Sequence, residues 1–162
     1  MPREERIVLS RTYEADVEDV WDLWTTKEGL ESWWGPEGFR VTVHSVDLKP
    51  QGVMRYAMHA VAPQTIAFMK QHGLPTTTES RVTFTEVVPR RRLAYLHLAD
   101  FVPGVAPYDV AHQIDLAVHG ATVQLTLTID RMHDEEWTKR AVMGWEMELG
   151  FLGKVLAGEK VK

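Results

Sequence analysis

Two neighbouring segments in the last third of the chain alternate inward-facing and polar residues over their whole length. The first covers residues 108–118 and the second covers residues 122–129, and His119-Gly120 between them is typical of a tight hairpin. This period of two predicts an antiparallel sheet with one buried face and one exposed face. The positions predicted to share the buried face are Tyr108, Val110, His112, Ile114, Leu116, Val118, Val123, Leu125, Leu127 and Ile129.

A long amphipathic helix is predicted directly after this hairpin, over residues 134–157. Glu135 and Glu136 lie in its first turn, where acidic residues suit the helix dipole, and Gly158 ends it. Its apolar stripe is expected to cover the buried face of the sheet and consists of Trp137, Ala141, Trp145, Leu149, Leu152 and Leu156. Three glycines inside the helix, Gly144, Gly150 and Gly153, are expected to allow close approach to the sheet.

The rest of the chain adds strands and short helices around this unit. Residues 6–13 predict a first strand, and two short helices follow, one capped by Asp16 and one over residues 27–33. Period-two patterns after Gly38 predict further strands, and residues 63–73 predict an additional helix inserted between two of them. The fold class expected is α+β with a helix-grip arrangement: an antiparallel sheet of about six to seven strands wrapped around the long C-terminal helix, in a single domain over residues 1–162.

The composition excludes several classes of function. The chain of 162 residues has no cysteine, which excludes thiol catalysis and Cys-ligated zinc and fits a cytoplasmic location. Its net charge is −5, and the short run Arg90-Arg91-Arg92 is its only basic cluster, so no nucleic-acid partner is expected. The start of the chain, residues 1–6, shows no signal peptide, and no apolar run is long enough for a membrane span.

Several short motifs together resemble one family. Trp33-Trp34-Gly35-Pro36, Gly38-Phe39, Pro50 and Gly52 resemble the opening signature of the domain homologous to the C-terminal part of the activator of heat-shock-protein-90 ATPase. The central signature of that domain resembles Phe84-x-Glu86-Val87-x-Pro89 followed by Arg92-Leu93. Its last strand and helix resemble Thr122-x-x-Leu125-x-Leu127 and Gly144-Trp145 with Leu149 and Leu152. The resemblance extends from about residue 6 to residue 156.

The resemblance implies a START-like fold with a deep hydrophobic cavity between the sheet and the long helix. It also shows two departures: the usual Pro-Gly-Gly turn is Pro50-Gln51-Gly52 here, and the helix at 63–73 is an addition. The eukaryotic co-chaperone has a separate N-terminal domain for which a chain of this length leaves no room. We therefore expect the fold, rather than chaperone activation, to carry over.

The predicted strand faces supply a candidate lining for such a cavity. An apolar pocket with a few polar groups is the usual form of a small-molecule site. The candidate ligand-binding residues are Trp34, Met54, Tyr56, Met58, Phe84, Tyr95, His97, Phe101, Tyr108, His112, Trp137, Ala141 and Trp145. Filling of an ordinary hydrophobic core is the alternative for each of them, most clearly for Phe84.

His97 and His112 interrupt rows that are otherwise apolar. A buried neutral imidazole needs hydrogen-bond partners for its ring nitrogens. The partner could be a tyrosine hydroxyl, Glu146 or a ligand, and no carboxylate is evident on the neighbouring rows. The two histidines are therefore interpreted as satisfied core residues, as ligand-orienting residues or as acid–base groups. No catalytic residue is assigned.

No cofactor or metal is expected. His97 and Asp100 lack a third ligand at suitable spacing, and the sequence has no glycine-rich nucleotide-binding motif. The preferred hypothesis is the binding of a small hydrophobic or aromatic molecule. The alternatives are a cyclase- or hydrolase-like enzyme that uses His97 or His112 as a base, and a chaperone-related protein-interaction module. The apolar loop 101–105 also makes a homodimer possible.

Overall fold

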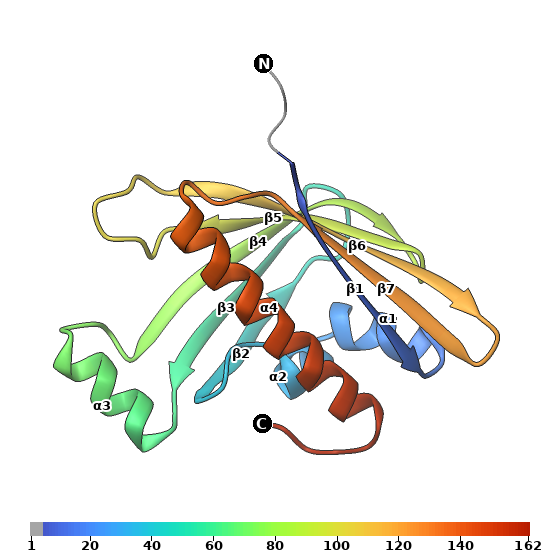
Figure 1. Ribbon diagram of the computed structural model, residues 1–162, viewed down its shortest axis with the longest axis horizontal. Helices are drawn as coiled ribbons and strands as arrows, with labels where there is room; N and C mark the ends of the chain where they lie inside the picture. Colours follow the sequence, from blue (N-terminus) through green and yellow to red (C-terminus); the bar gives the residue numbers. More distant parts are fainter. Residues whose placement is uncertain (1–4) are drawn as a thin grey trace.

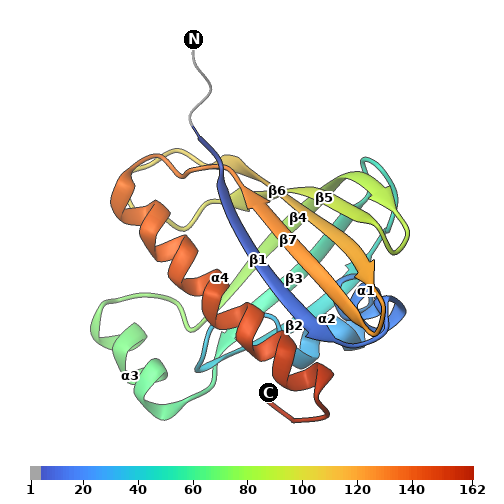
Figure 2. The same ribbon diagram turned by 45° about the vertical axis from the view of Figure 1, so that its right-hand side comes forward.

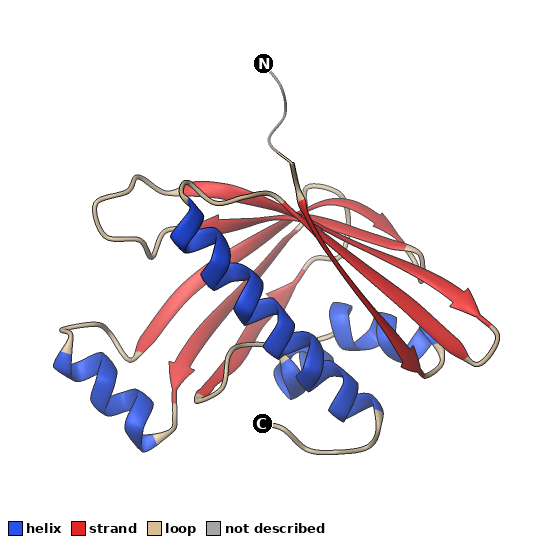
Figure 3. Cartoon of the chain, viewed as in Figure 1, coloured by secondary structure: helices blue, strands red, loops and turns tan. Residues whose placement is uncertain are grey.

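A computed structural model describes residues 5–162 of the chain, and most of the N-terminal segment used in the signal-peptide argument lies outside this range. It contains seven strands and four helices, coloured by type in Figure 3. In chain order they are β1 (Ile7–Glu14), α1 (Val17–Thr25), α2 (Lys27–Trp33), β2 (Phe39–Val46), β3 (Val53–Ala60), α3 (Pro63–Gln71), β4 (Thr77–Val88), β5 (Arg92–Ala99), β6 (Tyr108–His119), β7 (Thr122–Ile129) and α4 (Glu135–Leu156).

The strands form one antiparallel sheet in the order β1-β7-β6-β5-β4-β3-β2. Successive strands from β2 to β7 are sheet neighbours, whereas β1 pairs with β7, so α1 and α2 connect the two opposite edges of the sheet. The helix α4 crosses one side of the curved sheet diagonally (Figure 1). This is the α+β helix-grip arrangement predicted from the residue pattern.

The alternating pattern of β6 and β7 is confirmed by their register, except that Val118, predicted to be buried, is exposed at the end of β6. Ile114 faces Leu127 and Leu116 faces Leu125, and all four side chains are buried. Burial in β7 alternates along its whole length, as period-two patterning requires. The buried face of this pair therefore points toward α4.

The helix α4 begins at the Asp134 cap, whose side chain accepts a hydrogen bond from the Trp137 N–H. Its second half packs on β1, where the Tyr13 hydroxyl donates to the Leu149 carbonyl at 2.8 Å. Gly153 permits this contact, because a Cβ there would lie 3.1 Å from the Tyr13 ring. Figure 2 shows α4 alongside β1.

The prediction that close approach to the sheet explains the glycines of α4 is wrong for Gly144 and Gly150. Among residues 5–162, a Cβ at Gly150 would meet nothing within 4 Å, and one at Gly144 would meet only the Glu148 carboxylate, at 3.9 Å. Neither glycine is required by an approach to the sheet. Gly144 instead lies beside a pocket, described below.

Tryptophans join α1 and α2 to α4. Trp24 packs edge-on against Trp33 and stacks on Trp145, with ring centroids 4.8 and 5.7 Å apart. Trp33 is fully buried, and its indole N–H donates to the Leu23 carbonyl. Asp16 stands at the N-cap of α1 as predicted, but its side chain makes no capping hydrogen bond. The packing of these aromatic rings therefore holds the helical layer together.

The helix α3 stands apart from the rest of the molecule (Figure 1). None of its residues is buried, and Phe68 on it is 54% exposed. Its anchor is at its N-terminal end, where Thr65 lies close to Gly38 and the Val61 N–H donates to the Gly38 carbonyl. Within residues 5–162, no helix has the length and apolar character needed to cross a membrane.

Candidate ligand-binding site

A pocket of about 200 Å³ lies between β5, β6 and the first half of α4. Its walls combine apolar side chains with a small number of polar groups. The exposed ring of Phe101, in the loop after β5, stands at this pocket 5.8 Å from the Trp137 ring. The lining residues are His97, Leu98, Ala99, Phe101, Val110, His112, Ile129, Asp130, Met132, Ala141, Gly144, Trp145 and Glu148.

His97 enters the pocket from β5 and is held by a tyrosine. Its Nε2 lies 2.6 Å from the Tyr56 hydroxyl, across β4 from β3. Burial lowers the pKa of His97 to about 3, with a smaller effect from the neighbouring His112, so the imidazole is neutral. Burial also raises the pKa of Tyr56, which keeps its hydroxyl protonated. His97 is thus fixed at one ring nitrogen, and the residue remains partly exposed in the pocket.

His112 has partners at both ring nitrogens. Its Nδ1 donates to the Val110 carbonyl at 3.0 Å, and its Nε2 accepts from the Trp145 indole N–H at 3.3 Å. The Tyr95 ring stacks on the imidazole, with centroids 4.9 Å apart. Burial lowers the pKa of His112 to about 4. The His112 imidazole therefore forms a neutral, fully hydrogen-bonded part of the pocket wall.

The structure adds Glu148, a polar group that the residue pattern did not indicate. Its Oε1 accepts a hydrogen bond of 2.7 Å from the Gly35 backbone N–H. Burial raises the pKa of Glu148 to about 7, opposed by the Gly35 hydrogen bond and by the charge of Lys162. Glu146, the carboxylate suggested from the sequence, is exposed and is not in this pocket. Glu148 follows Trp145 by three residues and Gly144 by four, a helical spacing that could have indicated it.

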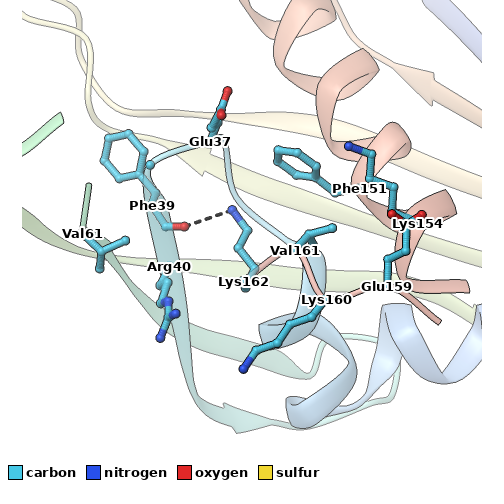
Figure 4. Close-up of a pocket in the computed structure, with 11 residues that line it drawn as sticks. Glu37, Phe39, Arg40, Val61, Phe151, Lys154, Glu159, Lys160, Val161 and Lys162 are labelled. Carbon is cyan, nitrogen blue, oxygen red and sulfur yellow. Dashed lines mark hydrogen bonds between the residues drawn. The ribbon is translucent and has the colours of Figure 1, made fainter. Parts of the chain in front are cut away.

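The backbone of Gly35 links Glu148 to Lys162, since its N–H donates to Glu148 and its carbonyl accepts from Lys162. The ammonium of Lys162 donates to the carbonyls of Gly35, Pro36 and Phe39, each at 3.0 Å, and Figure 4 shows its contact with Phe39. Gly35 adopts a φ of 98°, which strongly favours glycine. A second hollow, of about 380 Å³, surrounds this tail and is lined by charged side chains of both signs (Figure 4).

The predicted site residues fall into three groups in space. Five line the 200 Å³ pocket: His97, Phe101, His112, Ala141 and Trp145. Four line a much smaller internal space of about 10 Å³: Trp34, Met54, Phe84 and Tyr95. The other four lie around these two groups, with Tyr56 on His97, Met58 packed against the core, Tyr108 bonded to His133 and Trp137 beside Phe101.

The centre of the molecule is therefore largely filled, in place of the deep cavity that the resemblance implies. Trp24, Trp34 and Tyr95 occupy that space and leave room for about one water molecule. The Trp24 indole N–H and the Tyr95 hydroxyl are buried there without a hydrogen-bond partner among residues 5–162. The 200 Å³ pocket lies instead at the end of β5 and the start of β6, next to the loop that carries Phe101.

Comparison with known proteins identifies the family. The family model described as Activator of Hsp90 ATPase homolog 1-like protein matches residues 14–157, which is most of the chain. The chain belongs to this family. The match includes β2 to β7, α4 and every residue that lines the pocket. Membership in the family agrees with the START-like fold of the structure.

Solved structures of several bacterial proteins share the fold. A protein from Chromobacterium violaceum superposes with a TM-score of 0.77 at 23% identity, covering 93% of this chain and 96% of that one. The AHSA1 protein from Silicibacter pomeroyi gives 0.72 at 19% identity, with coverages of 94% and 98%. The AHSA1-like protein from Aeromonas hydrophila gives 0.68 at 17%, with 94% and 93%. No curated protein matches the chain significantly.

Proposed function

We propose that this protein binds a small aromatic or apolar molecule in the 200 Å³ pocket between β5, β6 and α4. One observation carries the proposal: the neutral imidazole of His97 and the carboxyl group of Glu148 stand among apolar and aromatic walls in a space open to solvent. A few oriented polar groups in an apolar pocket provide specificity, while the apolar walls provide most of the affinity.

The volume of the pocket limits the size of the ligand. A dry cavity of about 150 Å³ is large enough to hold benzene. A pocket of about 200 Å³ therefore suits one substituted aromatic ring rather than a long lipid chain. The exposed Phe101 ring at the pocket can cover part of a bound ring.

The histidines support binding rather than base catalysis. A general base works best when its pKa lies near the operating pH, and the pKa values of His97 and His112 are lowered to about 3 and about 4. His112 also has both ring nitrogens in hydrogen bonds. A cyclase- or hydrolase-like reaction that uses His97 or His112 as its base would therefore rest on a weak base at neutral pH.

Gly144 provides a direct test of the proposal. We expect Gly144→Leu to fill the pocket, because a Cβ at this position meets only the Glu148 carboxylate, at 3.9 Å. Gly150→Leu is the matched control on the same helix, since it projects into open space. Each protein would be titrated with benzyl alcohol and with indole while backbone NMR shifts are recorded.

The expected result is that shifts cluster at Leu98, Ala141 and Trp145 in the wild type and in Gly150→Leu, and disappear in Gly144→Leu. Shifts elsewhere, or shifts that persist in Gly144→Leu, would refute the proposed site. Native mass spectrometry of gently purified protein would show in parallel whether a small molecule is already bound.

A further inference from the structure

We propose that the pocket selects small aromatic cations, such as protonated amines, with the Glu148 carboxylate as the counter-charge. This inference rests on the proposed function and adds the chemical class of the ligand. It depends on the charges that line the pocket, on its aromatic rings and on the hydrogen bonds of Glu148.

Among residues 5–162, the lining of the pocket carries acidic groups and no lysine or arginine. Of its two carboxylates, Asp130 is paired with Arg6 at 3.1 Å. Glu148 uses Oε1 for the Gly35 N–H, and no hydrogen bond is found for its Oε2 within residues 5–162. A carboxylate ligand would therefore meet no cation in this lining, whereas an ammonium group would find an acceptor.

The remaining walls also favour a positive charge. The rings of Phe101 and Trp145 line the pocket, and aromatic rings attract cations through their negative faces. His97 and His112 are neutral, so they do not repel a cation. The free Nδ1 of His97 can accept a hydrogen bond from an ammonium group in the tautomer whose Nε2–H donates to the Tyr56 hydroxyl.

The charged and titratable groups around Glu148 come from several elements. Lys162 approaches from the C-terminal tail, and its ammonium is already bonded to three carbonyls of the 35–39 loop. Tyr56 on β3 and Tyr95 on β5 stay protonated, because burial raises the pKa of each hydroxyl and the negative charge of Glu148 raises it further. His97 and His112 face the same pocket, as does the Asp130 carboxylate.

This arrangement makes the affinity for a cation depend on pH. With a pKa of about 7, Glu148 in the empty pocket is mostly protonated at pH 6 and mostly ionised at pH 8. A primary amine stays protonated over this range, and it binds the ionised carboxylate preferentially. Its affinity should thus rise by up to about tenfold from pH 6 to pH 8.

Three ligands of similar shape test the inference: benzylamine, benzyl alcohol and benzoate. Dissociation constants would be measured by NMR titration at pH 6 and pH 8 on the wild type, Glu148→Gln and Glu146→Gln. Glu148→Gln keeps an oxygen acceptor for the Gly35 N–H, and Glu146→Gln removes an exposed carboxylate from the same helix. We expect benzylamine to bind about tenfold more tightly than benzyl alcohol at pH 8, since a charged hydrogen bond is roughly twice as strong as a neutral one. Benzoate should bind most weakly.

Loss of both the amine preference and the pH dependence in Glu148→Gln, with both retained in Glu146→Gln, would support the inference. Equal binding of benzyl alcohol and benzylamine to the wild type, or an amine preference that survives in Glu148→Gln, would overturn it and leave the proposed function intact. Absence of binding by all three compounds would overturn both.

Discussion

Tyr56 and Tyr95 show how much the partner of a single hydroxyl group matters. Both lie on the inward face of the sheet and both are buried. The Tyr56 hydroxyl is 2.6 Å from His97 Nε2, whereas the Tyr95 hydroxyl has no partner among residues 5–162. A satisfied buried hydroxyl stabilises a protein modestly, and an unsatisfied one costs free energy. The same substitution should therefore have different effects at these two positions.

We expect Tyr56→Phe to lower the free energy of unfolding by about 1 kcal/mol, because it leaves the His97 nitrogen without its partner. Tyr95→Phe should leave stability unchanged or raise it, since it removes a buried donor that has no acceptor. Urea denaturation of both variants measures the difference. An equal loss in both variants would contradict the assignment of Tyr95 as unpaired.

At the scale of one element, α4 carries out two tasks along its length. Its second half is a packing surface, where Gly153 lets the Tyr13 ring approach and Leu149 accepts the Tyr13 hydroxyl. Its first half carries pocket residues, among them Gly144 and Trp145. The three glycines of the helix therefore have different surroundings, although the sequence alone suggests one explanation for all of them.

Alanine at Gly150 should raise the free energy of unfolding by roughly 0.5–1 kcal/mol, because glycine is a poor helix former and the site has open space. Alanine at Gly153 should lower it, since the new methyl group would lie 3.1 Å from a Tyr13 ring that its own hydrogen bond fixes. Thermal and urea unfolding of the two variants would check the opposite signs. Stabilisation at both sites would show that β1 can move away from α4.

At the scale of the whole molecule, groups in one pocket bind protons differently in the folded and unfolded states. The folded-state pKa values of His97 and His112 are lowered from 6.5 to about 3 and about 4. That of Glu148 is raised from 4.5 to about 7. Between about pH 4.5 and 6.5, unfolding therefore takes up protons at the two histidines and releases one at Glu148.

Proton uptake by the two histidines should thus lower the free energy of unfolding as the pH falls through this window. Proton release from Glu148 should lower it as the pH rises. In the wild type, the free energy of unfolding should increase with pH over this window. We expect His97→Gln to reduce the slope of this increase by the equivalent of about one proton, and Glu148→Gln to raise the slope by a similar amount. Urea denaturation at half-unit steps of pH gives the slopes. Parallel curves for both variants and the wild type would contradict these pKa shifts.

Most of the fold could be predicted from the sequence because its strands and long helix bury one face each. The alternation in β6 and β7 and the stripe of α4 both identify that face from residue spacing alone. Alternating patterns and helix-capping residues predicted the remaining elements in the same way, and the match over residues 14–157 confirms the family resemblance.

The site was less predictable, since it depends on which inward-facing side chains leave space between them. Alternation along the strands identified His97 and His112 as inward-facing, and both line the pocket. Met54 and Phe84 also face inward, but they lie around the small internal space. Glu148 was missed because its partner, the Gly35 N–H, lies in a loop 113 residues away. Spacing along a helix does not show which backbone group will reach it.

The isolation of α3 has a practical consequence for work on this protein. The helix has no buried residue, and the strands on either side of it pair across its base, where the Ala60 N–H donates to the Thr76 carbonyl. Chain added at an exposed point of this kind is tolerated when the flanking backbone keeps its own hydrogen bonds. A fluorescent label or a fused reporter protein attached to α3 should therefore leave α4 and its contacts unchanged.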